Sequence, residues 1–332
     1  MQLPPWLRDA IEEIAAEVPQ RDLARAAAEL TEAYRSGNFS RAPLDSHARR
    51  VAYLAQRMPA TYGACARVFR EIRSLVPDFA PQSMHDLGSG PGTATLAATE
   101  AWPAMLTCTL IERDTQLSKI AERLLKASPR EAANEAWWFD IDLETFQPKQ
   151  KTELAEELVV MSYGLTEFTS SRQAELLSMA WNIASHLLVL IEPGTPRGFA
   201  NILSARERLT GLGAHIVAPC PRSVAHPCPM AEAGDWCHFA QRVERTALHR
   251  ALKGGELGYE DEKFAYVVLS RQPLPTAQSR IVRHPAIRKG HVELQLCTPT
   301  GLQRVTAGKS KKDRYRAARK AGWGDAFQIL TV

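Results

Sequence analysis

Apolar side chains at helical spacing dominate the first part of the chain. They recur every three or four positions from Leu7 to Ala15, directly after Pro4 and Pro5, which predicts a helix that begins near residue 5. The same spacing predicts three further helices, over residues 21–35, 46–57 and 60–75. We therefore expect residues 1–78 to form an N-terminal helical domain.

Beyond residue 82 the pattern changes to short apolar runs that alternate with helical segments. These runs predict seven strands, over residues 83–87, 106–111, 137–141, 158–162, 187–191, 214–218 and 264–269. The fourth and fifth are continuous apolar runs, which are typical of parallel strands covered on both faces. Strands joined by helical crossovers indicate a doubly wound, Rossmann-like α/β sheet, which we expect over residues 79–271.

Two segments do not fit a plain sheet. Residues 219–262, between the last two strands, are too long for a hairpin and hold three cysteines, so we interpret them as a functional insertion. After Arg271 the chain becomes basic, and alternation over residues 292–296 predicts a strand. We expect residues 272–332 to form a basic C-terminal extension with a small β element.

Composition narrows the class of protein. In a chain of 332 residues, an apolar share of 45% is enough for a sizeable core, and a net charge of +4 is compatible with nucleic acid without being diagnostic of it. The N-terminus has neither a basic nor an apolar leader, and the longest apolar run, residues 187–191, is far too short to span a bilayer. We expect a soluble protein of the bacterial cytoplasm, monomeric and without a membrane partner.

A glycine-rich loop follows the first predicted strand. Its sequence, Asp-Leu-Gly-Ser-Gly-Pro-Gly over residues 86–92, lets the backbone turn sharply and approach a ligand closely. An acid at the end of the second strand is placed to accept both hydroxyls of a ribose, and an acid at the end of the third is placed to bind an adenine amino group. The candidate ligand-binding residues are Asp86, Gly88, Gly90, Gly92, Glu112 and Asp140.

Three interpretations of this loop compete. The first is a structural turn beside an exposed acid, and the second is a nicotinamide dinucleotide site. Nicotinamide-binding loops normally read G-x-G-x-x-G. Here the third glycine, Gly92, comes one position earlier and Thr93 follows it. The third interpretation is favoured, because Asp86 ahead of the first glycine resembles the S-adenosylmethionine (SAM) motif of class I methyltransferases.

Six cysteines are unevenly distributed, and in a reducing compartment we expect no structural disulfides among them. Cys65 and Cys108 stand alone in apolar surroundings, which predicts core positions. The candidate metal ligands are Cys220, Cys228 and Cys237 in the insertion and Cys297 in the extension. Thiolates are soft ligands suited to zinc and to iron–sulfur clusters, although the spacing is not that of a zinc ribbon.

Two alternatives for these cysteines stay open at this point. They are four unrelated buried residues, or three of them bind zinc together with one histidine. The candidate histidines are His226, His238 and His249.

Basic residues gather in two places. In residues 241–253 they recur at spacings that fit one helical face, and a second group lies in the tail. The candidate RNA-binding residues are Arg242, Arg245, Arg250, Lys253, Lys309, Lys311, Lys312, Arg314 and Arg319. Such a stripe neutralises phosphates and suits structured RNA, while a solvated helix face is the plain alternative.

The cysteine segment resembles one known family. Cys220-Pro221, Cys228-Pro229, the D-W-C-H-F run of residues 235–239 and the K-G-G-E-L-G-Y-E-D-E-K-F run of residues 253–264 carry the resemblance, together with E-P-G-T-P at 192–196 and A-R-K-A-G-W-G-D at 318–325. They are similar to the mitochondrial ribosomal small-subunit methyltransferase-like family, which includes methyltransferase-like protein 17 and bacterial relatives. The resemblance covers residues 60–330. One departure is local: Arg222 and Ser223 stand where relatives often have a histidine and an acid.

The resemblance implies a fold, a cofactor and a partner. The fold is a class I SAM-dependent methyltransferase domain. The cofactor is a [4Fe-4S] cluster on the four cysteines named above, with zinc as the fallback. The partners are the small ribosomal subunit rRNA and its proteins during assembly.

Whether the chain transfers a methyl group is a separate question. Enzymes that methylate base amino groups often carry an Asn/Asp-Pro-Pro-aromatic motif after the fourth strand, and residues 161–168 here read M-S-Y-G-L-T-E-F. We therefore expect a SAM-binding, iron–sulfur-containing assembly factor that binds rRNA. The alternative is an active methyltransferase acting on rRNA or a ribosomal protein. A third role, the sensing of iron or of redox state through the cluster, is compatible with either function.

Overall fold

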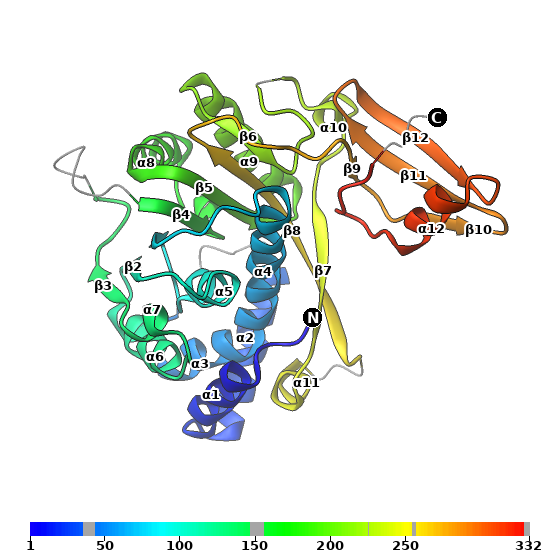
Figure 1. The fold of residues 1–332 in the computed structure, drawn as a ribbon. Helices are drawn as coiled ribbons and strands as arrows, with labels where there is room; N and C mark the ends of the chain where they lie inside the picture. The colour runs from blue at the N-terminus through cyan, green and yellow to red at the C-terminus, as the bar shows by residue number, and fades with distance from the viewer. Residues whose placement is uncertain (36–43, 147–155, 225, 254–256, 329–332) are drawn as a thin grey trace. The chain divides into compact units, whose positions relative to one another are not determined.

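A computed structural model describes residues 1–35, 44–146, 156–224, 226–253 and 257–328 (Figure 1). The chain forms two compact units. The first comprises Met1–Arg70, Ala80–Ser185 and Gln241–Glu262, and the second comprises Glu71–Phe79, His186–Ala240 and Lys263–Val332. The predicted three-part division at residues 78 and 271 stays a prediction. Among the described helices, none has both the length and the apolar character needed to cross a membrane.

Four helices precede the sheet, as the spacing of apolar residues predicts. They are α1 (Pro5–Ala16), α2 (Gln20–Arg35), α3 (His47–Gln56) and α4 (Met58–Leu75). Helix α1 begins with Pro5, whose fixed φ suits the first turn, and it buries Leu7, Ile11 and Ile14. Ser46 caps α3 by accepting a hydrogen bond from the Arg49 backbone N–H. Helix α1 packs against α3, and α3 against α2.

The central sheet contains all seven predicted strands. They are β1 (Ser83–Leu87), β2 (Thr107–Glu112), β3 (Trp137–Asp140), β4 (Glu156–Ser162), β5 (Ala184–Pro193), β6 (His215–Ala218) and β8 (Tyr259–Ser270). Their order is β3-β2-β1-β4-β5-β8-β6, with β1 parallel to β2 and β4 and with β8 antiparallel to β5 and β6. An eighth strand, β7 (Phe239–Glu244), pairs with β8 and was not predicted.

Helices connect the parallel strands of the first unit. These are α5 (Thr93–Ala101), α6 (Thr115–Lys126), α7 (Glu131–Asn134) and α8 (Ser170–Ile183), with a 3-10 turn, η2, at Leu165–Glu167. The first unit also holds α11 (Ala247–Lys253), which packs against α2 and α3. Strand β1 is buried from Met84 to Leu87, although its sequence includes the polar residues His85 and Asp86.

The second unit ends in a small separate sheet. Helices α9 (Pro196–Gly211) and α10 (Pro229–Glu232) come first, and then β9 (Arg280–Ile281), β10 (Ala286–Arg288), β11 (His291–Thr298) and β12 (Gly301–Gly308). Helix α12 (Lys312–Lys320) lies against β11 and β12 (Figure 1), and its Ala318 joins Val292, Leu294 and Leu296 in a small core. Strand alternation places Cys297 on the opposite face from Leu296, packed with Met230 and Val282.

The predicted single helical face over residues 241–253 is wrong. Arg242 lies on strand β7 and Arg245 follows that strand, so only Arg250 and Lys253 belong to a helix, α11. The reason is that β7 buries Phe239 and Val243 in strand alternation. Pairing with β8 therefore decides the structure here, not the spacing of the basic residues.

Candidate ligand sites: a glycine-rich loop and a four-cysteine cavity

The glycine-rich loop between β1 and α5 depends on backbone conformations that favour glycine. Gly88, Gly90 and Gly92 have φ of 69°, 54° and 74°. A Cβ added at Gly92 would lie 2.7 Å from Leu125 Cδ1, so this glycine permits close packing onto α6. A Cβ added at Gly90 would meet nothing within 4 Å among the described residues, so the loop faces open space at this point.

Asp86 lies at the base of the loop and is fully buried. Its Oδ2 accepts hydrogen bonds from the Thr95 backbone N–H at 3.1 Å and from Thr95 Oγ1 at 2.9 Å. Its Oδ1, like Ser89 Oγ, has no hydrogen-bond partner among the described residues. Burial raises the pKa of Asp86 to about 6, and the Thr95 hydrogen bonds oppose that rise. Two buried polar atoms at this loop therefore have unsatisfied hydrogen-bonding capacity within the described residues.

Asp86→Asn tests whether this buried carboxylate destabilises the chain in the absence of ligand. An acid whose pKa is raised by folding stabilises the fold only below its unfolded pKa of 3.8, and this contribution is lost as the pH rises through about 6. We expect Asp86→Asn to be more stable than the parent at pH 7 by up to about 3 kcal/mol, and to lose that advantage near pH 4. Thermal unfolding between pH 4 and 8 measures this, with the exposed Asp78→Asn as the control. A stability gain that does not vary with pH would contradict it.

Glu112, at the end of β2, organises the loops on either side of it. Its Oε2 accepts the Gly90 N–H at 2.9 Å, and its Oε1 accepts the backbone N–H groups of Arg113 and Asp114, each at 2.9 Å. Asp140 is its register partner on β3, so the two predicted acids stand side by side at the ends of adjacent strands. The glycine loop and the acids that should bind a ribose and an adenine therefore occupy one edge of the sheet.

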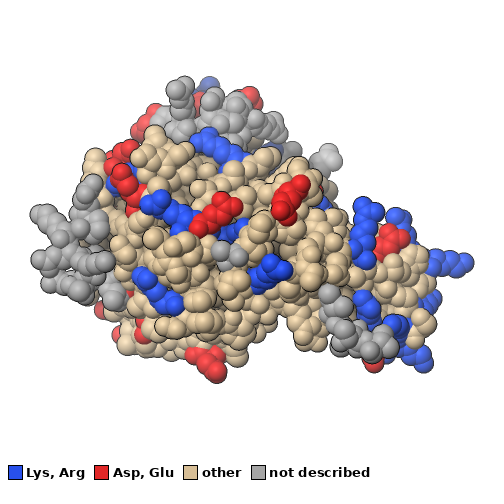
Figure 2. Space-filling view, turned by 90° about the horizontal axis from the view of Figure 1, so that it is seen from above, with Lys and Arg blue, Asp and Glu red and all other residues tan. Residues whose placement is uncertain are grey.

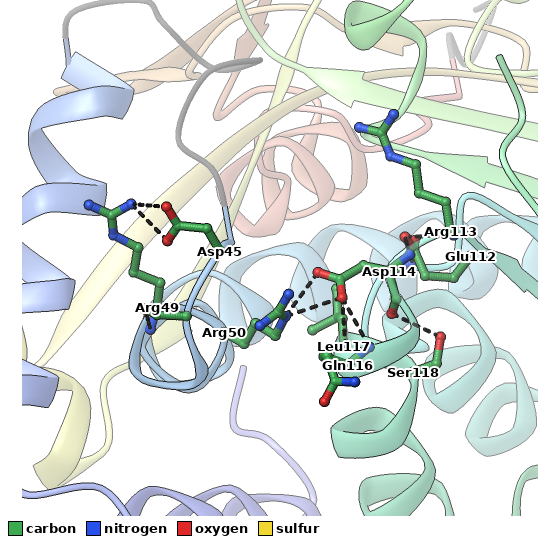
Figure 3. A network of polar contacts seen from close by, with 11 residues as sticks. Asp45, Arg49, Arg50, Glu112, Arg113, Asp114, Gln116, Leu117 and Ser118 are labelled. Carbon is green, nitrogen blue, oxygen red and sulfur yellow. Dashed lines mark hydrogen bonds and ion pairs between the residues drawn. The ribbon is translucent and has the colours of Figure 1, made fainter. Parts of the chain in front are cut away.

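Figure 3 shows how the segment after β2 is fixed. Asp114 caps α6 by accepting the N–H groups of Gln116 and Leu117, at 3.0 and 3.1 Å. The same carboxylate is paired with Arg50 of α3 at 2.9 Å. The pair is partly buried, and it links helix α3 to the segment between β2 and α6, where the Asp114 N–H donates to Glu112.

The four candidate ligand cysteines line one cavity in the second unit, with a volume of about 40 Å³. Cys220 follows β6, Cys228 is the residue before α10, Cys237 precedes β7, and Cys297 lies on β11. None of them forms a disulfide. The structure thus places all four thiols around the same cavity, and their role as metal ligands stays a prediction.

Burial dominates the electrostatics of these thiols. It raises the pKa of Cys297 to about 12 and that of Cys237 well above its usual value. The neighbouring thiols raise both pKa values further, whereas Arg280 lowers both. Among the described residues, no group of three or more His, Cys, Asp or Glu side chains is placed to hold one metal ion as the side chains stand.

The three alternative histidine ligands have separate environments. His226 lines the cysteine cavity, with Nδ1 at 2.9 Å from the Val224 carbonyl oxygen. His238 is stacked on Trp236 with ring centroids 5.2 Å apart, and Trp323 meets it edge-on at 4.7 Å. His249 is fully buried and belongs to the first unit, and burial lowers its pKa to about 4.

Sequence reasoning missed two buried arginines in the wall of the cavity. Arg206, on α9, is 4% exposed, and Arg280, on β9, is 1% exposed. The signal for Arg206 was present, because it interrupts the apolar stripe formed by Phe199 and Ile202 on α9. Nothing in the sequence singled out Arg280 in its two-residue strand.

The basic residues of the first unit are mostly engaged within the fold. Arg242 forms a forked ion pair with Asp261 at 2.8 and 2.9 Å. Glu260 Oε2 accepts hydrogen bonds from Arg245 at 3.2 Å and from Lys253 at 2.6 Å. Arg250 is exposed on α11. Most of the predicted stripe therefore has acidic partners inside the protein.

The tail residues present their charge to solvent. Lys309, Lys311, Lys312 and Arg319 are exposed, and Arg314 is half-buried. Lys and Arg atoms predominate over Asp and Glu atoms on this part of the surface (Figure 2). Exposed basic residues nearby in the sequence, outside the predicted set, are Arg288, Lys289, Arg304, Arg316 and Lys320.

The strand order, the glycine loop after β1 and the acid after β2 define a class I methyltransferase-like α/β fold, as predicted. Within that class the chain belongs to the Rsm22 family, described as mitochondrial small ribosomal subunit Rsm22, which matches residues 47–328. This family is the one that the cysteine segment resembles.

Two curated relatives illustrate the family. The human mitochondrial ribosome assembly protein METTL17 is 30% identical over 297 residues, which is 85% of this chain and 63% of the relative. The mitochondrial Rsm22-cox11 tandem protein 2 of Schizosaccharomyces pombe is 28% identical over 84% of this chain and 43% of the relative. The chain thus spans less than two thirds of the length of either relative.

Solved structures give more distant likenesses. A putative RNA methyltransferase from Pyrococcus horikoshii has a TM-score of 0.39 and 14% identity, and covers 62% of this chain and 81% of its own. Magnesium protoporphyrin IX methyltransferase from Synechocystis, solved with SAM bound, has a TM-score of 0.40 and 13% identity, and covers 63% of this chain and 80% of its own.

Proposed function

We propose that this chain is a small-subunit ribosome assembly factor that binds rRNA, carries a [4Fe-4S] cluster and binds SAM. The observation that carries the proposal is that four cysteines from separate segments line one cavity in a member of the Rsm22 family. METTL17, a relative with 30% identity, is named as a ribosome assembly protein. We further propose that the chain acts as a monomer on ribosomes in the bacterial cytoplasm.

The cluster proposal rests on the chemistry of the donor set. Cys220, Cys228, Cys237 and Cys297 supply four thiolates, the usual ligands of a [4Fe-4S] cluster, in a cavity whose remaining walls are largely apolar. Bound there, the cluster would tie the loops before α10 and β7 to strand β11. Iron, sulfide and zinc analysis of the anaerobically purified full chain tests the proposal, and stoichiometric zinc without iron would refute the cluster.

The SAM proposal rests on the loop after β1. Open space above Gly90, the unpartnered Asp86 Oδ1 and the adjacent acids Glu112 and Asp140 fit a ligand with a cationic end and a ribose. The same open loop favours, as a second candidate, an active methyltransferase that acts on rRNA or a ribosomal protein.

One feature argues against the second candidate. Tyr163, directly after β4, has a φ of 60°, and its hydroxyl donates a hydrogen bond to Glu262 at 3.0 Å. Enzymes that methylate base amino groups often carry their acceptor-binding motif at this place, whereas the Tyr163 hydroxyl is engaged here in an internal polar contact. We therefore favour an assembly factor that uses SAM as a structural or sensing ligand.

The tail gives an RNA-binding prediction. Replacing Lys309, Lys311, Lys312 and Arg319 with glutamine removes four exposed charges. We expect affinity for small-subunit rRNA to fall by at least about tenfold near physiological salt and the salt dependence to become shallower, because fewer counterions are released on binding. Binding titrations at several salt concentrations measure both effects.

A matched control removes the same charge from the first unit. Arg8, Arg21, Arg25 and Lys119 are exposed there and lie outside the predicted RNA-binding set. Their combined replacement with glutamine should leave affinity within about threefold of the parent. Equal losses in the two variants would mean that net charge, and not the tail surface, drives binding.

A further inference from the structure

Helix α9 presents one face to the cysteine cavity. Phe199, Ile202, Leu203 and Arg206 line the cavity from positions i, i+3, i+4 and i+7 of the helix. Three of these side chains are apolar, as expected for a buried face. The fourth is a guanidinium group that is 4% exposed. A leucine or methionine would fill the same place without burying a charge, so Arg206 needs an explanation beyond packing.

The contacts of Arg206 are directed at the cysteine segment. One terminal nitrogen (NH1) donates to Cys220 Sγ at 3.7 Å, and the other (NH2) donates to the His226 carbonyl oxygen at 2.6 Å. The arginine therefore holds one candidate ligand and the loop between Cys220 and Cys228. Within the described part of the chain, Arg206 is paired with no carboxylate.

The second buried arginine differs in this respect. Arg280 lies 2.7 Å from Glu71 and also donates to the carbonyl oxygens of Pro219 and Gly324. Its charge is thus balanced by an acid of the same unit. Because a guanidinium stays protonated in proteins, the buried charge of Arg206 calls for a negative partner. The cysteine sulfur atoms of the same cavity, of which Cys220 Sγ is hydrogen-bonded to Arg206, can provide this negative charge.

We infer that Arg206 is a positioning residue of the cysteine centre. It holds Cys220 and the His226 carbonyl oxygen in place, and its positive charge stabilises the negative charge of metal-bound thiolates. The inference rests on the proposed function because it requires a bound metal. It does not require that this metal be iron. Two consequences follow. The centre is retained longer with Arg206 than without it, and an iron–sulfur cluster accepts one electron from a reductant more readily, because reduction adds negative charge beside the arginine.

The experiment uses the full chain purified anaerobically with its metal. Arg206→Met keeps a long, unbranched side chain but removes the charge. Arg206→Lys keeps the charge but removes the forked contact of the guanidinium group. Arg208→Met is the matched control, because Arg208 is exposed on the same helix. Metal release to a chelator and the midpoint potential in a dithionite titration are measured, with thermal unfolding to verify that each variant is folded.

We expect Arg206→Met to release metal about tenfold faster than the parent. We also expect its one-electron reduction equilibrium to shift about tenfold toward the oxidised cluster, which corresponds to a potential lower by about 59 mV. Arg206→Lys should keep a potential near the parent value while releasing metal faster, and Arg208→Met should match the parent in both. Because the lysine variant keeps the charge, it separates electrostatics from packing if the methionine variant folds poorly.

The outcomes distinguish a failure of this inference from a failure of the iron–sulfur proposal. If Arg206→Met keeps both the release rate and the potential of the parent, the inference is overturned while the iron–sulfur proposal stands. If the parent holds zinc, the iron–sulfur proposal fails, and the release rate of zinc still decides the role of Arg206. A parent chain that takes up neither metal overturns both.

Discussion

Cys237→Ser should leave the purified protein almost without iron and destabilise it by several kcal/mol. Cys237 is half-buried in the second unit, and three other thiols act on it electrostatically. A serine hydroxyl is a poor ligand for a soft metal centre, so the cluster loses one of its four attachments. Since a site of this kind does not exist in the unfolded chain, binding free energy contributes directly to folding. Iron and sulfide content, the visible absorption spectrum and thermal unfolding measure the effect.

The two remaining cysteines supply the matched control. Cys65 and Cys108 are buried in the first unit, and the structure confirms that they are core residues. Cys65→Ala and Cys108→Ala should keep the full iron content and cost only the stability of a small core truncation, about 1 kcal/mol. A Cys237→Ser protein that retains its iron would contradict the ligand assignment. So would a Cys65→Ala protein that loses its iron.

Much of the fold could be predicted because its strands are buried on both sides. β4 and β5 are continuous apolar runs, and the turn after β1 needs glycine, so both signals lie in consecutive residues. Three of the four candidate ligand cysteines stand out for a similar reason, because they lie close together on one long insertion. These features are local in sequence, and local patterns are what periodicity detects.

The insertion could not be predicted in the same way. The basic spacing of residues 241–253 fits a helix, but its first part pairs with β8, whose residues follow later in the chain. The partners of the basic residues, Glu260 and Asp261, also lie on β8, so the ion pairs form only when that strand is in place. Strand pairing across a loop depends on tertiary contacts, and these override the local signal.

Arg206 illustrates a different limit. Its place on an apolar helix face can be read from α9 alone, but its partners Cys220 and His226 come from the segment after β6. A buried charged residue can be recognised in a sequence where it interrupts a stripe of apolar residues on one face of a helix. What balances that charge is known only once the chain has brought the segments together.

Gly90→Val should weaken SAM binding by at least about 100-fold. The Cβ position at Gly90 faces open space among the described residues, so a branched side chain would occupy the volume proposed for the ligand. The loop would also be strained, because φ is 54° at this position and left-handed backbone costs a residue other than glycine about 1–2 kcal/mol. Isothermal titration with SAM measures the affinity, and thermal unfolding measures the strain.

Gly213→Val separates these two effects. Gly213 has a φ of 89° and no described atom within 4 Å of an added Cβ, but it lies after α9 in the second unit, away from the glycine-rich loop in sequence. It should show a comparable loss of stability with unchanged SAM affinity. If the two variants bind SAM equally well, the ligand does not occupy the space above Gly90, and the SAM proposal fails.

The Gly90→Val variant also decides between the two candidate functions in cells. With Gly90→Val as the only copy, an assembly factor that senses SAM predicts fewer mature small subunits while every rRNA methyl group remains. An active rRNA methyltransferase predicts that one methylated position disappears from the rRNA, and a protein methyltransferase predicts the same for one ribosomal protein. Mass spectrometry of rRNA and ribosomal proteins, read beside subunit profiles, distinguishes these results. Because the Tyr163 hydroxyl, at the place of an acceptor-binding motif, is already hydrogen-bonded to Glu262, we expect every methyl group to remain.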